Sequence, residues 1–152
     1  MSGWWGVLLV GGGALMWFVV LDLGYDVSER LARWWVGRAQ RWPGRVGPRS
    51  LGLSAAVLMA YVGLALVGRA LGAQLGDPRW GLLISGPALL AYALFMLATA
   101  PLARGGYQYW RDDLRAAGAD PALQRRIAWW AGVPSFVGMV VALASLVLTF
   151  VR

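Results

Sequence analysis

Four long apolar runs alternate with polar, arginine-bearing segments along the chain. The runs cover residues 4–24, 51–73, 80–103 and 128–150. At a rise of about 1.5 Å per residue, each run is long enough to cross about 30 Å of hydrocarbon as an α-helix. Membrane β-strands are about ten residues long and alternate strictly, which these runs do not. The pattern therefore predicts an all-α integral membrane protein, a four-transmembrane-helix bundle that forms one polytopic domain over residues 1–152.

The composition supports this class and narrows the chemistry. Apolar residues make up 59% of the 152 residues and charged residues 14%, against about 25% charged residues in an average soluble domain. A soluble fold of this length could not bury that much apolar surface. The chain contains no Cys and no His. Thiol redox chemistry, His-ligated haem and Cys or His zinc sites are therefore excluded, and we predict no cofactor and no metal ion.

The arginines predict how the chain is oriented. All fourteen basic residues are Arg, and eleven of them lie in the two loops at residues 25–50 and 104–127. The positive-inside rule then places both loops in the cytoplasm and both termini outside it. Arg without Lys, together with abundant Ala, Gly and Trp, is typical of a GC-rich bacterial genome. We therefore predict a multi-pass protein of a bacterial inner membrane, whose net charge of +7 reflects these loops and not a nucleic-acid partner.

The first loop carries the pattern of a basic amphipathic helix between the first and second spans. Asp26 and Glu29 have the spacing of a capping box, and Pro43 ends the pattern. Apolar and basic positions fall on different faces, which predicts a helix in the headgroup region that contacts anionic lipid. The predicted contacts are Arg30, Arg33, Arg38, Arg41, Trp34, Trp35 and Trp42. The alternative is that the first span continues as one helix into the cytoplasm.

The second loop predicts two helices. Residues 108–117 form a polar helix that Gly118 ends, with Asp112 and Asp113 as solvated surface groups. Asp120 and Pro121 then have the residue types of an N-cap and a first helical position. This second helix is expected to run through Arg125 and Arg126 directly into the fourth span.

Two spans carry stripes of small residues at helical spacing. The stripe in the fourth span consists of Ala131, Ser135, Gly138, Ala142 and Ser145, and that in the second consists of Gly52, Ala56, Ala60 and Gly63. Small residues allow close approach of helices in lipid. Two interpretations follow: either the stripes hold the four helices to one another, or one of them docks a partner protein.

Two charged residues within the spans are functional candidates, because charges at membrane depth are costly. Asp22 lies near the cytoplasmic end of the first span and Arg69 near the outer end of the second. Each is close enough to an interface to snorkel. Asp22 and Asp26 are four residues apart, so that on one helix face they could hold a divalent ion. The alternative roles for these two acids are an N-cap and an ion pair with a nearby Arg.

The sequence shows no recognisable catalytic set, and it favours a non-enzymatic function. We expect a small accessory, anchoring or assembly subunit of a larger bacterial inner-membrane complex, whose partners are lipids and either other membrane subunits or a second copy. A small oligomeric transporter or channel is the alternative. It would use Gly11, Gly12 and Gly13 and a weak internal repeat between residues 5–11 and 80–86. A lipid-modifying enzyme that uses Asp22 and Asp26 is a third hypothesis.

Overall fold

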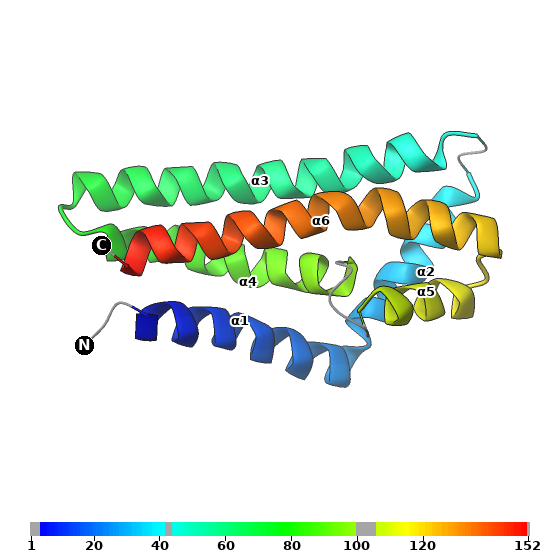
Figure 1. Cartoon of the computed structure of the whole chain (residues 1–152), viewed down its shortest axis with the longest axis horizontal. Helices are drawn as coiled ribbons and strands as arrows, with labels where there is room; N and C mark the ends of the chain where they lie inside the picture. The colour runs from blue at the N-terminus through cyan, green and yellow to red at the C-terminus, as the bar shows by residue number, and fades with distance from the viewer. Residues whose placement is uncertain (1–3, 42–43, 100–105, 152) are drawn as a thin grey trace.

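The computed structural model describes residues 4–41, 44–99 and 106–151, and these residues form helices joined by short turns. Figure 1 shows the arrangement. The elements in chain order are α1 (Trp4–Tyr25), α2 (Val27–Ala39), α3 (Val46–Gln74), the 3-10 helix η1 (Pro78–Gly81), α4 (Leu82–Thr99), α5 (Gly106–Ala116) and α6 (Pro121–Phe150).

Four helices are long and apolar enough to span a membrane, namely α1, α3, η1 together with α4, and α6. The predicted four spans and all-α class are confirmed at this level. The helices α3 and α6 are 29 and 30 residues long, and each begins before the apolar run that it contains. Their first turns therefore lie beyond the apolar segment, among the arginines. The predicted end of the third span at residue 103 lies outside the described residues.

The helices α3, α4 and α6 pack against one another, and α1 lies along α4 and α6. Both termini lie at one end of the bundle, which we call the terminal end, and α2 and α5 lie at the other, the loop end (Figure 1). Within α1 only Val7 and Ala14 are buried. Most of its large apolar side chains point outward, as expected of a peripheral helix that lipid surrounds.

The apolar interior is divided into a core within the bundle and a second core at the loop end. In the bundle, the rings of Tyr61 and Tyr92 are stacked with their centroids 4.7 Å apart. The loop-end core joins α2, α5 and the first turns of α6, and its fully buried members include Trp35, Trp110 and Ile127. The two arginine-bearing loops therefore fold into a helical layer that packs on the end of the bundle.

The predicted start of α6 is confirmed by its geometry. The Asp120 side chain accepts hydrogen bonds from the backbone N–H groups of Ala122 and Leu123 at 2.8 and 2.9 Å, and Pro121 is the first residue of the helix. Gly118 adopts a φ of +90° just after α5 ends at Ala116, which a left-handed C-terminal cap requires. The residues that cap these two helix ends contact groups only a few positions away in the sequence, so the sequence alone predicts them.

The predicted capping box at the start of α2 is wrong. Asp26 has a φ of +49° and its side chain makes no capping hydrogen bond. The helix α1 continues to Tyr25, so a single residue has to redirect the chain into α2, and a short polar side chain tolerates the left-handed conformation that this needs. The interpretation of the first span and the loop as one continuous helix is also excluded, because Asp26 separates α1 from α2.

Candidate functional site

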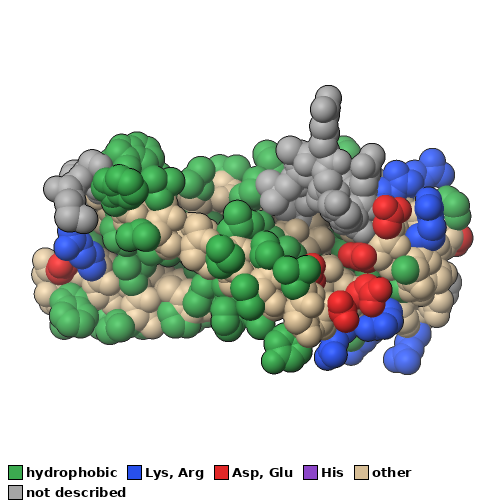
Figure 2. Space-filling model, turned by 90° about the horizontal axis from the view of Figure 1, so that it is seen from below, with side chains coloured by type: hydrophobic (Ala, Val, Ile, Leu, Met, Phe, Trp, Pro, Cys, Tyr) green, Lys and Arg blue, Asp and Glu red, His purple; other side chains and the backbone are tan. Residues whose placement is uncertain are grey.

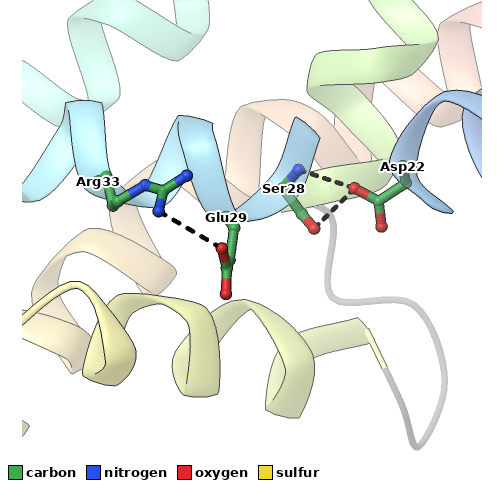
Figure 3. A network of polar contacts seen from close by, with 4 residues as sticks. All are labelled: Asp22, Ser28, Glu29 and Arg33. Atoms are coloured by element: carbon green, nitrogen blue, oxygen red, sulfur yellow. Dashed lines mark hydrogen bonds and ion pairs between the residues drawn. The ribbon is translucent and has the colours of Figure 1, made fainter. Parts of the chain in front are cut away.

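Asp22 connects the end of α1 to the start of α2 at the loop end. One of its carboxylate oxygens accepts hydrogen bonds from both the backbone N–H and the hydroxyl of Ser28, each at 2.8 Å (Figure 3). A carboxylate at a helix N-terminus is stabilised by the unpaired N–H groups and the helix dipole. Asp22 therefore acts as the cap of α2 that the sequence assigned to Asp26. The neighbouring pair of Glu29 and Arg33, 3.6 Å apart, is largely exposed.

Asp113 approaches the same junction from α5. Burial and then the negative charge of Asp22 raise the pKa of the Asp113 carboxyl to about 6, and a hydrogen bond with the Ser28 side chain opposes this rise. Glu29 and Asp112 add further repulsion. The prediction that Asp113 is a solvated surface group is therefore wrong. The helical spacing offered the signal, because Asp113 lies beside Leu114 and three residues after Trp110, both of which are buried.

The junction concentrates acidic side chains beside the apolar surface of the bundle, and Figure 2 shows them next to the arginines of the loop end. No group of three potential ligands among the described residues is arranged to hold a metal ion. Asp26 has left the helical conformation of α1, so it does not share a helix face with Asp22 as predicted. The ordered contacts of Asp22 are those of a structural joint between α1, α2 and α5.

The small-residue stripe of α6 faces the inside of the bundle. Ala131, Ser135, Gly138 and Ala142 are buried and Ser145 is partly buried. The hydroxyl oxygens of Ser135 and Thr99 are 2.5 Å apart, which joins α6 to α4. A Cβ atom placed on Gly138 would collide with the phenol of Tyr92. This stripe therefore packs against other helices of the same chain. The absence of a side chain at Gly138 leaves the space that the Tyr92 ring occupies.

The small-residue stripe of α3 faces outward instead. Gly52, Ala56, Ala60 and Gly63 are all exposed. We call this surface the outer face of α3. Residues two positions further along a helix lie nearly opposite, and Ser54 is accordingly buried. Two stripes of similar sequence therefore point in different directions, one toward the bundle and one away from it.

The predicted lipid contacts of the first loop include both exposed and buried residues. Arg30, Arg33, Arg38 and Arg41 are exposed, and Trp34 is 41% exposed, with the Arg38 guanidinium 5.0 Å from its ring. Trp35 is completely buried and donates a hydrogen bond from its indole N–H to the Ser50 hydroxyl at 3.0 Å. Its assignment to lipid is therefore wrong, because the apolar face of α2 covers protein. Trp42 lies outside the described residues.

Arg69 lies near the terminal end of α3, far along the bundle from Asp22, so the two predicted intramembrane charges are not brought together. It lines a cavity of about 260 Å³ between α3, α6 and the start of the α4 segment. This cavity was not predicted, since it depends on how three helices diverge at one end.

With four helices long and apolar enough to span a membrane, these features suggest a multi-pass membrane protein that has a helical layer at one end of its bundle. The chain matches no known protein family, no curated protein and no solved structure. The arrangement of its own residues therefore carries the functional inference.

Proposed function

We propose that the protein is a small, non-enzymatic accessory or assembly subunit of a larger bacterial inner-membrane complex, and that it holds a partner transmembrane helix against the outer face of α3. The observation that carries this proposal is the exposure of that face. Its four small residues are uncovered, whereas the stripe on α6 is filled by the helices of the same chain. In lipid, close van der Waals packing over small residues is a main source of helix association.

The outer face of α3 differs from the rest of the apolar surface. On α1, for example, Leu9 is 72% and Leu23 is 83% exposed, as suits side chains surrounded by lipid. On α3 the small residues are flanked on one side by the exposed side chains of Met59 and Leu66. A row of small side chains beside these larger ones lets the ridge of another helix approach closely. Lipid alone imposes no requirement for such a row.

Three hydroxyl groups of the spans favour this function over a transporter or channel. A polar pathway needs groups that are available to a solute or to water. In the bundle, Ser85 donates to the Gly81 carbonyl at 3.0 Å, Thr149 to the Ser145 carbonyl at 2.8 Å, and Thr99 to the Phe95 carbonyl at 2.8 Å. These hydroxyl protons are committed to their own helices, so they offer little to a permeating polar species.

Cysteine cross-linking provides a direct test, because the natural chain contains no Cys. The variant Ala60→Cys places a thiol on the outer face of α3, and Ala91→Cys places one on an exposed position of α4 as the matched control. In native membranes, oxidation should link Ala60→Cys to a second copy, or a cysteine-reactive cross-linker should join it to one defined partner. The control should give neither product.

A packing test completes the experiment. Ala60→Leu and Gly63→Leu should each reduce by at least about tenfold the amount of that partner that co-purifies in mild detergent, because bulk at the interface separates the helices. Ala91→Leu should leave it unchanged. The proposal fails if both outer-face variants retain the partner at the parent level, or if the control loses it equally.

A further inference from the structure

The cavity at the terminal end combines apolar walls with one cationic group. It lies between α3, the η1–α4 segment and α6 and has a volume of about 260 Å³. Its apolar lining includes Val62, Ala65, Val141 and Leu148, and its polar lining consists of Arg69 and three hydroxyl residues, Ser85, Ser145 and Thr149. Among the described residues, no acidic side chain lines it. An apolar space with a few placed polar groups is the usual form of a small-molecule site.

Arg69 makes no ion pair with any residue that the structure describes. The only acidic residue of the segment between α3 and α4 is Asp77, whose carboxylate accepts a hydrogen bond from the backbone N–H of Arg79 at 2.8 Å and caps η1. Arg69 lies five residues before the end of α3, which corresponds to about 7.5 Å along the helix. A charge at this depth is costly without a counter-ion, yet near enough to the surface to meet a headgroup.

Two of the three hydroxyl groups of the cavity do not compete with Arg69 as donors. Ser85 donates to the carbonyl of Gly81 at 3.0 Å, and Thr149 donates to the carbonyl of Ser145 at 2.8 Å. The guanidinium is therefore the main group in the cavity that can donate charge-assisted hydrogen bonds to a ligand. Arginine binds phosphate through paired N–H groups, so the polar end of a fitting ligand is an anion such as a phosphate.

We propose that this cavity binds an anionic phospholipid, with its phosphate on Arg69 and part of an acyl chain along the apolar walls. The absence of acidic side chains from the lining gives the site charge complementarity to the headgroup. The apolar walls distinguish a lipid from a free phosphate ion, which would gain nothing from them. The site uses none of the four small residues of the outer face of α3, and Leu66 is the described residue that borders both surfaces. The substitutions that test the lipid site therefore leave those four small residues unchanged.

The test is native mass spectrometry of the full chain, delipidated in detergent and titrated with phosphatidylglycerol or with zwitterionic phosphatidylcholine. Arg69→Gln should weaken phosphatidylglycerol binding about tenfold, since a charge-assisted interaction is lost. The matched control is Arg79→Gln, which removes an exposed arginine at the same end that does not line the cavity. It should change binding less than twofold. Equal losses in the two variants, or no loss in either, would overturn the proposal.

A second variant tests the apolar part of the site without altering its charge. Ala65→Leu fills the cavity and should also reduce phosphatidylglycerol binding, whereas Ala91→Leu on α4 should not. Thermal unfolding of each variant shows whether the fold is retained. Undiminished binding to a folded Ala65→Leu variant would contradict the placement of the lipid in this cavity. Inorganic phosphate should not displace the lipid, and displacement at equal concentration would show a site for the free anion instead.

Discussion

Asp113 is a carboxyl group on the partly buried side of a short helix, close to the carboxylate that caps its neighbour. A group whose pKa is raised by folding binds its proton more tightly in the folded state. The pKa of Asp113 rises from an ordinary value of 3.8 to about 6. Its contribution to stability is therefore fully present below about pH 4 and is lost as the pH rises through about 6.

Replacing Asp113 with Asn should remove this pH dependence. We expect Asp113→Asn to be more stable than the parent at pH 8 by about 1 kcal/mol after allowance for solvent screening, and to show no advantage near pH 4. Thermal unfolding in detergent at both pH values measures the difference. Asp112→Asn is the comparison and should gain less stability, because Asp112 makes the smallest contribution to the raised pKa of Asp113. A variant that is less stable than the parent at pH 8 would contradict a raised pKa of Asp113 in the folded state.

The residues that cap helices show which local contacts can be predicted from the sequence. Asp120 and Pro121 were predictable because the donors they serve follow within three residues. Asp22 was not, because it caps α2 from the preceding helix, six residues before Ser28. That contact exists only once Asp26 has turned the chain, and the left-handed conformation of Asp26 has no specific sequence signal.

At the scale of elements, the stripes on α3 and α6 both repeat small residues every three or four positions, but one stripe is exposed and the other is mostly buried. The spacing predicts a face suited to packing, but the direction in which that face points depends on the neighbouring helices. For α6, Tyr92 on α4 fills the space above Gly138. For α3, the buried face is formed by other residues, including Ser50, Ser54 and Tyr61.

The packing of α6 against Tyr92 leads to a prediction for Gly138. Gly138→Leu should destabilise the bundle by about 1–3 kcal/mol or more, because the added side chain has no space and overpacks the core. Gly12→Leu is the matched control, since nothing lies within 4 Å of a Cβ atom at that position of α1. Thermal unfolding in detergent compares the two. Equal stability of both variants would mean that the helices separate at Gly138 without cost.

At the scale of the whole molecule, the four spans followed from the sequence and the layer at the loop end did not. The apolar runs are long enough that no other structure satisfies their backbone groups in lipid. The loops showed amphipathic helices, but an apolar face predicts burial without saying whether lipid or protein covers it. Trp35 is buried by α4, α5 and α6 through contacts with residues such as Phe95 and Trp110, far away in sequence.

The positions of the termini and of the arginines also allow a prediction of how the protein is oriented in the membrane. Both termini lie at one end of the bundle and the arginine-bearing helices at the other (Figure 1). We expect the arginine-bearing end in the cytoplasm, so a C-terminal alkaline phosphatase fusion should be active and a C-terminal green fluorescent protein fusion should be dark. Fusions to residue 118, between α5 and α6, should give the reverse result. A fluorescent C-terminal fusion would contradict this topology.

The peripheral position of α1 has a consequence for how the protein is made. The helix precedes α4 and α6, the two helices against which it packs, and α6 is the later of these neighbours to be synthesised. At roughly 5–20 residues per second, α1 waits on the order of 10 s in the bilayer before that neighbour exists. Exposure of its outward leucines, valines and tryptophans during this time costs little free energy, because lipid solvates these side chains as well as protein would. The first span can therefore insert before its neighbours are made. The hydrogen bonds between Asp22 and Ser28 meanwhile hold the end of α1 against the start of α2.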